Sequence, residues 1–359
     1  MTLLYILLAI LLLGILIAVH EFGHFFAARL MHIEVEQFAI GFGPKLIKWR
    51  SKRHGTFFSV RAVPIGGFCS FYGEHDVNGE MKNDPKSLVN QNVWKRIFMI
   101  VMGPGMNFLV ALIVAVVFFW ASGTDVVTGV DPFVAEVMAA GPAYDAGMKN
   151  NDIITEINGK NMLDGTIDTL LNTISGYREG DPPMEVKVLR GKETVPLTVT
   201  PVLDAETGRM RVGVTIGGVY RTEHIPLDLP GAAVQGWQLC VNASGAVLNA
   251  LKDLVTAGKG FENMSGPVGI VSIVSQEVEN GGFRNLVLLL VILSVNLGLM
   301  NLLPIPGLDG SRLVFGLIEA VRGKPVPIEK ESMIHFVGLI LLLGLLLIFT
   351  FNDVARLFR

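Results

Sequence analysis

His20-Glu21-Phe22-Gly23-His24 closes an uncharged run that begins at Met1 and is almost wholly apolar from Leu3 to Val19. Histidines four residues apart share one face of a helix, about one turn from each other. This spacing suits a tetrahedral metal ion, and a glutamate beside the first histidine is placed to act as a general base. The plainer alternative is a histidine-bearing helix end at a membrane surface. Ionisable groups in a membrane-length apolar segment are costly, so the sequence favours a functional site here.

The composition is that of an integral membrane protein with a water-exposed part. Of its 359 residues, 51% are hydrophobic and 17% are charged, whereas a soluble domain has about 25% charged residues. The formal net charge of −3 argues against a nucleic-acid-binding protein. Cys69 and Cys240 are far apart and indicate neither a disulfide framework nor a cysteine metal site. The apolar N-terminal run has no basic start and no small-residue cleavage site, so we expect it to be retained.

Four segments are long and uncharged enough to cross a bilayer. They are Thr2 to Val19, continuing as helix towards Arg29, then Ile97 to Thr124, Asn285 to Leu308 and Ser332 to Asn352. A fifth segment, Leu229 to Leu251, is also uncharged but contains several amides and a serine. We expect it to be an amphipathic helix on the membrane or beside the site.

Two prolines and a carboxylate at the end of the third segment predict the missing metal ligand. A catalytic zinc site usually has three protein ligands and leaves the fourth position to water. Pro304 and Pro306 break the helix, and Asp309 follows directly. The alternative for Asp309 is an ordinary cap at the end of a span. We favour a ligand, because it supplies the third group that the histidine pair lacks.

The direction of the spans agrees with this assignment. His20 lies about 27 Å along its helix from Thr2, in a hydrocarbon core about 30 Å thick. The histidines and Asp309 then share one face of the membrane only if a single span separates the first segment from the third. Counting Leu229 to Leu251 as a span would place Asp309 on the opposite face.

The loops predict the orientation. The loop from Arg29 to Arg96 carries 11 Lys and Arg residues, which marks it as cytoplasmic. The N-terminus is then outside and the metal site is near the cytoplasmic face. The segment from Asp125 to Phe283, with 20 acidic and 11 basic residues, faces outside, although so long a loop has little influence on orientation.

The cytoplasmic loop also contains turn signals around short apolar stretches. Gly41-Phe42-Gly43-Pro44 and Val63-Pro64-Ile65-Gly66-Gly67 flank a segment that includes Phe57 to Val60. We expect β-hairpin strands that dip into the membrane beside the site. Irregular backbone is tolerated there when it packs on protein or lines a wet cavity.

These motifs resemble the site-2 protease family, the zinc intramembrane proteases of regulated intramembrane proteolysis. The resemblance covers nearly the whole chain. Within the family, the chain most resembles the bacterial branch that acts on anti-sigma factors and signal-peptide remnants. The segments that carry it are His20 to His24, Gly103-Pro104-Gly105-Met106-Asn107-Phe108, Ser265 to Ile270 and Asn301 to Gly310.

The resemblance implies the roles of the site residues. Zn²⁺, one per chain, would be held by His20, His24 and Asp309, with Glu21 as the catalytic base. Asn301 would bind the substrate backbone, and Asn296 and Asn107 are weaker candidates whose alternative is hydrogen bonding between helices. The hairpin region would hold an unwound substrate strand through its turns, at Gly41, Gly43, Pro64, Gly66 and Gly67.

The outer segment resembles a single PDZ domain. Gly141-Pro142-Ala143-Tyr144-Asp145-Ala146-Gly147 and the following Asn151-Asp152-Ile153-Ile154 are similar to the PDZ pattern, with Asn151 where glycine is usual. Asparagine also tolerates the left-handed backbone conformation. A PDZ domain binds an extended peptide by strand addition, and we expect the strand near Val127 to Val130 to accept it. A domain that only blocks access is the alternative.

The predicted fold is a polytopic α-helical membrane protein with four spans, a membrane-associated β-hairpin region on the cytoplasmic side and one extracytoplasmic α+β PDZ domain. Its expected partners are the lipid bilayer, single-pass membrane proteins as substrates, and a peptide or substrate tail at the PDZ domain. A first cut of the substrate outside the cytoplasm would precede the cut that this protein makes within the membrane.

The expected divisions of the chain are 1–30 (span with the histidine motif), 31–95 (loop with hairpin), 96–124 (span), 125–205 (PDZ domain), 206–283 (linker with amphipathic helix), 284–310 (span with the third ligand), 311–331 (cytoplasmic loop), 332–352 (span) and 353–359 (tail).

Other functions fit less well. Asn242-Ala243-Ser244-Gly245 with His335 faintly suggests a serine protease, but it lacks a glycine and lies outside the predicted spans. An aspartyl protease needs two facing membrane aspartates, and only Asp309 qualifies. A membrane-anchored scaffold would not need Glu21 beside the histidines. A metal-ion transporter would need more ionisable residues within its spans.

Overall fold

The computed structural model describes residues 3–74, 84–139, 141–163, 167–178, 180–204, 210–258, 260 and 265–357. The last two residues of the expected C-terminal tail lie outside this set. The chain forms two compact units, one made of Met1–Ala121 with Leu227–Arg359 and the other of Ser122–Pro226. We describe each unit separately.

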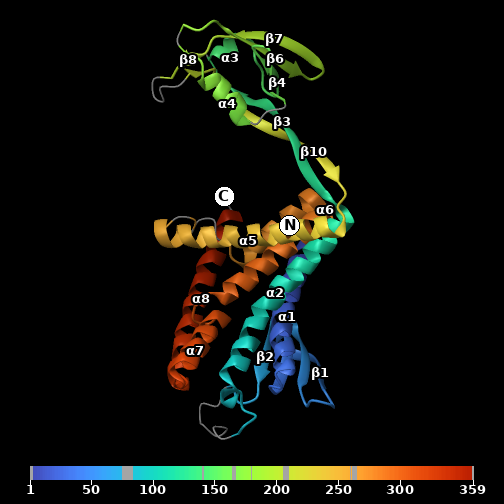
Figure 1. The fold of residues 1–359 in the computed structure, drawn as a ribbon, viewed down its shortest axis with the longest axis vertical. Helices are drawn as coiled ribbons and strands as arrows, with labels where there is room; N and C mark the ends of the chain where they lie inside the picture. The colour runs from blue at the N-terminus through green and yellow to red at the C-terminus, as the bar shows by residue number, and fades with distance from the viewer. Residues whose placement is uncertain are drawn as a thin grey trace. The chain divides into compact units, whose positions relative to one another are not determined.

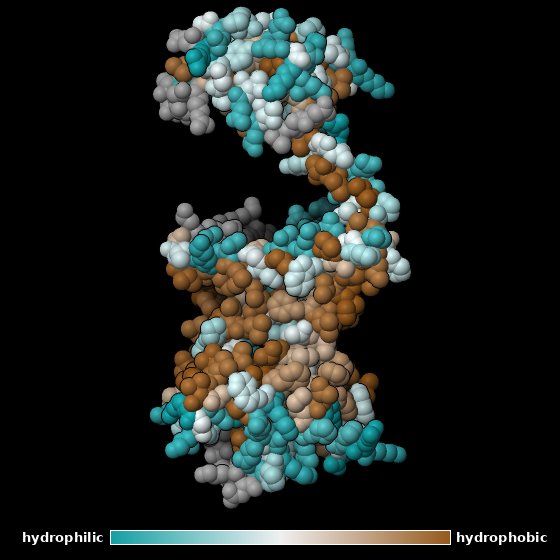
Figure 2. Space-filling model, viewed as in Figure 1, coloured by the Kyte–Doolittle hydropathy of each residue, from teal (hydrophilic) through white to brown (hydrophobic). Residues whose placement is uncertain are grey.

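The first unit is built on long helices, four of which are apolar and long enough to span a membrane (Figure 1). Its helices are α1 (Leu3–Leu30), η1 (Leu88–Asn90), α2 (Val93–Ser122), α5 (Leu229–Ala257), α6 (Pro267–Leu302), α7 (Asp309–Arg322) and α8 (Ile328–Leu357). The four membrane-length helices are α1, α2, α6 and α8. Figure 2 shows a continuous hydrophobic band over the helices of this unit, with hydrophilic residues at both of its ends. Four apolar helices are therefore present, as predicted.

Glycine contacts bring α1, α2 and α6 together closely. A Cβ atom on Gly23 of α1 would collide with the Met102 carbonyl of α2, and one on Gly103 would collide with the His24 ring. A Cβ on Gly298 of α6 would lie 3.1 Å from the Pro104 carbonyl oxygen. The helices approach this closely because these positions have no side chain, which is the usual way that membrane helices pack.

Helix α5 lies across the membrane-length helices (Figure 1) and is not one of the four. Asp228 caps its N-terminus by accepting the Gly231 N–H at 2.9 Å, and Gly258 ends it with a left-handed φ of 61°. Cys240 packs in a buried cluster with Ala111 and Ala115 of α2 and with Val291 and Val295 of α6. The helix therefore packs on the spans with one face, as an amphipathic helix does.

The helix limits differ from the expected divisions most clearly in the C-terminal part of the chain. Helix α6 begins at Pro267 rather than near residue 285, because Pro267 occupies a first-turn position where proline is tolerated. It is interrupted at Gly282, whose φ of 57° and ψ of −140° are not helical. Residues 309–322 form the amphipathic helix α7, which ends at Gly323, although 309 and 310 were expected in the third span and the following residues in a loop. Helix α8 starts at Ile328, ahead of the expected residue 332.

Strands β1 (Val35–Arg50) and β2 (Phe57–Phe71) form a folded hairpin in the first unit. Both strands bend, so residues 37–40 of β1 have residues 67–70 of β2 on one side and residues 57–60 on the other. The bends fall at Gly41 and Gly43, with φ of 85° and 84°, and near Gly66, with φ of 100°. A Cβ on Gly14 of α1 would lie 2.6 Å from the Pro64 carbonyl oxygen, so β2 packs on a membrane-length helix.

The second unit is a small α+β domain. Its strands are β3 (Thr124–Val137), β4 (Ile153–Ile157), β5 (Lys160–Asn161), β6 (Met184–Arg190), β7 (Glu193–Val199), β8 (Val202–Leu203), β9 (Met210–Arg211) and β10 (Val214–Ile225), and its helices are α3 (Pro142–Asp145) and α4 (Ile167–Ser175). The main sheet has the order β10-β3-β4-β6-β7. Its core includes Val134, Ile154, Leu170 and Val188. Asn151 adopts a left-handed φ of 68°, which asparagine tolerates.

This unit extends past residue 205, where the sequence analysis ended the domain. Strand β10 pairs with β3 along its whole length, from Val214 with Val137 to Ile225 with Thr124. The two ends of the unit are therefore joined in one ladder of backbone hydrogen bonds. The pairing also occupies one edge of β3 at Val127 and Val130, where we expected a peptide to add.

An ion pair between Asp152 and Arg190 stabilises this unit locally, and its stabilising effect depends on pH. The Asp152 carboxylate is 1% exposed and accepts two hydrogen bonds from Arg190, at 2.8 and 2.7 Å. Burial raises the pKa of Asp152, but Arg190 and the Lys149 amide lower it further, so the net pKa is below its ordinary value. The stabilisation is therefore complete above the unfolded pKa and is lost as the pH falls through the lower folded value.

We expect Asp152→Asn to destabilise the second unit by about 2–4 kcal/mol at neutral pH, because Arg190 loses its charged partner. Hydrogen exchange of the β4 and β6 amides in the full chain measures this effect. The control is Asp145→Asn, an exposed carboxylate at the end of α3. Equal exchange rates in the two variants would show that the ion pair does not stabilise the sheet.

Candidate metal centre

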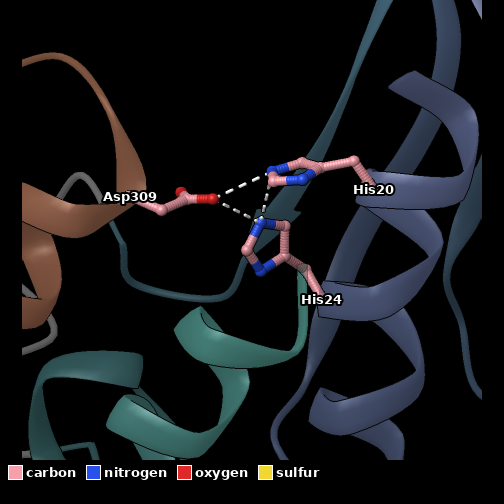
Figure 3. Close-up of side chains that lie close together, drawn as sticks. All are labelled: His20, His24 and Asp309. Carbon is pink, nitrogen blue, oxygen red and sulfur yellow. Dashed lines mark hydrogen bonds and ion pairs between the residues drawn. The ribbon is translucent and has the colours of Figure 1, made fainter. Parts of the chain in front are cut away.

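Three side chains that can bind a metal converge at the junction of α1 and α7 (Figure 3). The Asp309 Oδ2 atom lies 2.9 Å from His20 Nε2 and 3.1 Å from His24 Nε2. The two Nε2 atoms are 3.2 Å apart. Both histidines are buried and Asp309 is mostly buried. One atom from each side chain therefore faces a common point.

The spacing of these atoms fits zinc. With metal–ligand distances of about 2.0–2.1 Å, the ligand atoms of a tetrahedral zinc site are about 3.3 Å apart. The three observed separations, 2.9 to 3.2 Å, are close to that value. Two imidazoles and one carboxylate form a donor set used by catalytic zinc sites. In this part of the described chain, the residues present therefore suit a zinc ion.

Helix α2 fixes the orientation of His24. Its Nδ1 lies 3.0 Å from the Met99 carbonyl oxygen, which can only accept a hydrogen bond. Nδ1 therefore carries the proton, and the lone pair of Nε2 faces Asp309. Since Gly23 and Gly103 let the two helices touch at this level, the same contact sets both the helix spacing and the tautomer.

Asn107 of α2 lies beside Nδ1 of His20, as the Met99 carbonyl lies beside Nδ1 of His24. Its side-chain amide lies 3.3 Å from His20 Nδ1, and its Oδ1 atom is buried without a partner. The oxygen and nitrogen of an amide are assigned from their hydrogen bonds. Rotation of the amide by 180° would let Oδ1 accept the His20 Nδ1 proton and would satisfy the unpaired oxygen. Both Nε2 lone pairs would then face a carboxylate, an arrangement that a bound cation stabilises.

The turn at residues 303–308 delivers Asp309 to the histidines. Pro304 and Pro306 end α6, and Gly307 reverses the chain with a φ of 97°. A Cβ on Gly310 would collide with the Leu302 and Leu303 carbonyls, so the first turn of α7 lies against the end of α6. Asp309 is the first residue of α7, directly after the break that the prolines predicted.

Glu21 lies between two cavities that meet at the candidate centre. The smaller, of about 250 Å³, is lined by His20, Asn301 and Asp309 among others. The larger, of about 1240 Å³, reaches His24 and a group of charged side chains. Glu21 and Asp309 line both cavities. A carboxylate at this junction therefore borders open space on both sides of the candidate centre.

Two of the predicted substrate-binding residues, Asn301 and Gly67, lie beside the candidate centre. Asn301 lines the smaller cavity, while its Nδ2 donates to the Leu297 carbonyl at 3.0 Å. A Cβ on Gly67 would lie 3.3 Å from Glu21 Cγ, so this end of β2 lies beside the candidate base. Apart from Asn301, none of the predicted substrate-binding residues lines either cavity: Asn296, Gly41, Gly43, Pro64, Gly66 and Gly67.

Two ion pairs beside the centre were not anticipated from the sequence. Arg312 Nη1 of α7 lies 2.6 Å from Glu74 Oε1, and Arg96 of α2 pairs with Glu319. Arg312 and Glu319 are seven residues apart and so share one face of α7. The signal in the sequence is the amphipathic pattern of α7, most of which was expected to be a loop at 311–331.

We expect Asn107→Ala to weaken zinc binding by about 10–100-fold, because His20 loses the group that orients it. Competition with a chelator measures the dissociation constant of the purified protein. Asn296→Ala is the matched control, since Asn296 is an amide in a membrane-length helix and lines neither cavity. An unchanged affinity in Asn107→Ala would remove Asn107 from the metal centre.

One family model and several proteins of known name are similar to this chain. The family model described as Peptidase family M50 matches residues 8–345. "Regulator of sigma-W protease RasP" of Bacillus subtilis (strain 168) is 31% identical over 427 aligned positions, which cover 97% of this chain and 98% of the relative. Proteins named "Zinc metalloprotease RasP" in Oceanobacillus iheyensis and Bacillus licheniformis are 28% and 30% identical, with the same coverage. These matches show that the chain belongs to peptidase family M50, the site-2 protease family, and is a membrane metalloprotease that uses zinc.

Proposed function

We propose that this protein is an intramembrane endopeptidase that cleaves single-span membrane proteins within the bilayer. The observation that carries the proposal is that Asp309 of α7 meets His20 and His24 on α1. Helix α1 is apolar and long enough to span a membrane, and it also carries Glu21. A metal centre in such a helix serves substrates that are themselves in the membrane.

His20, His24 and Asp309 hold the zinc ion in this proposal, and Glu21 is the catalytic base. When bound, zinc acts as a Lewis acid on the scissile carbonyl and makes water more acidic. Glu21 takes a proton from water and later delivers it to the leaving amine, as general acid–base catalysis requires. Met99 and Asn107 keep the imidazoles oriented, so the geometry needs little reorganisation during the reaction.

The two cavities provide separate routes for water and substrate. Charged side chains line the larger cavity, including the Glu74–Arg312 and Arg96–Glu319 pairs, and this polarity suits the entry of water. The smaller cavity, between α1 and α6, contains Asn301, whose amide binds the substrate backbone in our proposal. A substrate helix must first unwind, because its carbonyls are occupied by its own hydrogen bonds.

Strand β2 supports the unwound segment. Residues 67–70 form an edge of the folded hairpin, with residues 37–40 on one side, and Gly67 adjoins Glu21. An extended substrate that aligns with this edge would pass Glu21. Gly41, Gly43, Pro64 and Gly66 then act indirectly, by shaping the bends that place this edge.

We propose that the second unit is a PDZ domain that recruits a peptide or the tail of a substrate. The outer strand β10 has β3 on one side only in the sheet, and Gly218 lies against Ile167 of α4. An edge strand beside a helix is the setting in which PDZ domains add a peptide strand. This edge replaces residues 127–130 of β3, where β10 is already paired.

The substrates we propose are anti-sigma-factor-like regulators and signal-peptide remnants, shortened beforehand by an extracytoplasmic cut. The name of the B. subtilis relative, "Regulator of sigma-W protease RasP", supports the first class. We further propose that the N-terminus and the second unit lie outside the cytoplasm, with the zinc site near the cytoplasmic face of a bacterial membrane. The 11 basic residues between Arg29 and Arg96 support this orientation.

We expect Glu21→Gln to retain zinc and lower cleavage of tagged single-span proteins by about 10²–10⁴-fold, because the proton acceptor is lost. The readouts are the size of the cleaved product in cells and the zinc content of the purified protein. Glu36→Gln, an exposed carboxylate on β1, is the control. Pre-shortened substrates test the need for a first cut.

Full cleavage by Glu21→Gln would exclude the proposed mechanism. If a broad panel of intact and pre-shortened substrates is not cut although zinc is bound, a scaffold becomes the better explanation. Zinc transport in vesicles without peptide hydrolysis would instead indicate a transporter.

A further inference from the structure

The turn that carries Asp309 depends on a side chain from another helix. Within residues 303–308, Pro304 and Pro306 have no N–H group. The amides of Leu303, Ile305 and Leu308 donate to carbonyl oxygens of residues 300, 303 and 305. The remaining amide, that of Gly307, donates to Nδ1 of His335 on α8 at 3.2 Å. His335 thus completes the backbone hydrogen bonds of the turn.

The hydrogen bond also defines the state of the His335 ring. A backbone N–H can only donate, so His335 Nδ1 must be an unprotonated acceptor. In the neutral ring the proton is then on Nε2, which is buried, lies 3.7 Å from Glu331 Oε1 and has no hydrogen-bond partner among the described residues. The ring packs edge-on against Phe315 of α7, with 5.7 Å between the ring centres. The imidazole of α8 therefore contacts both α7 and the turn.

A serine-hydrolase triad is the alternative explanation of this cluster. Ser311 Oγ lies 3.4 Å from His335 Nδ1, and Glu331 lies on the other side of the ring. The contacts argue against catalysis, because Ser311 Oγ donates to the Leu308 carbonyl at 2.7 Å and is buried. Gly307 already occupies the ring nitrogen that a nucleophilic serine would need.

Helix α8 contacts the turn closely at the same level. A Cβ on Gly338, one turn beyond His335, would collide with the Pro306 backbone. A Cβ on Gly307 would lie 3.1 Å from Leu342 Cδ1. The side chains of α8 are otherwise largely exposed, with 6% of its most apolar 18 residues buried. The contact with the turn is thus a specific one on a sparsely packed helix.

We propose that His335 is a positioning residue that sets the third metal ligand through the Gly307 amide. Gly307 is two residues before Asp309, and its left-handed backbone decides the direction in which the chain enters α7. Without an acceptor at Nδ1, the Gly307 amide loses its partner and the turn loses its attachment to α8. The carboxylate then occupies a wider range of positions relative to the histidines. The inference rests on the proposed role of Asp309 as a zinc ligand.

An isosteric pair of variants tests the acceptor itself. Asparagine and leucine have the same shape, but His335→Asn places an amide oxygen where Nδ1 accepts, whereas His335→Leu places a methyl group there. We expect His335→Leu to weaken zinc binding about 10–100-fold and His335→Asn to remain within about threefold of the native protein. Chelator competition on the full chain measures this, and the visible absorption of the cobalt-substituted protein reports any change in coordination. Met333→Leu, at a largely exposed position of α8, is the control.

His335→Gln shows whether weak binding by His335→Leu results from the lost acceptor or from misfolding. Its amide reaches towards Nε2, so it keeps a polar side chain but lacks the acceptor for Gly307, and we expect weak binding as in His335→Leu. Equal affinity in the asparagine, leucine and glutamine variants would overturn the proposal. The test is separate from peptide cleavage: a native protein that binds zinc but cuts nothing contradicts the proposed function while leaving the His335 result intact. If His20→Ala and Asp309→Ala bind zinc normally, both proposals fail.

Discussion

The contact between Asp309 and the two histidines of α1 is the constraint on which the first unit depends. It joins side chains that are 289 and 285 residues apart in sequence. Polar groups buried among apolar helices must be satisfied by one another or by a bound ion. Each ligand therefore brings its own support. Met99 and Asn107 come from α2, and the tight turn from α6 to α7 directs the carboxylate towards both rings.

Close helix contact makes this arrangement possible. Gly23 and Gly103 allow α1 and α2 to meet at the level of His24, and Gly298 allows α6 to approach α2 at Pro104. A side chain at Gly23 or Gly103 would collide with the neighbouring helix and force the two helices apart. The glycines thus have a chemical role as well as a packing role, because they keep the Met99 carbonyl within reach of His24.

Local sequence predicted the parts of the site that depend on short-range spacing. His20 and His24 are one helical turn apart, and the two prolines shortly before Asp309 predict a broken helix. Contacts between distant segments were harder to anticipate. The pairing of β10 with β3, the break at Gly282 and the His335–Gly307 bond each depend on which elements meet in space. No periodicity within a single segment encodes them.

The sparse packing of α8 has a consequence for the environment of the protein. Most side chains of this helix are exposed and would face lipid in a bilayer, and its apolar length lies between Glu331 and the buried Asp353, which accepts the Gly269 N–H at 2.7 Å. A helix in this situation adjusts its tilt to the thickness of the hydrocarbon layer. Because His335 and Gly338 contact the turn before Asp309, such tilting would change the height of the carboxylate relative to the histidines. The thickness of the surrounding bilayer would then be a variable of the metal centre itself.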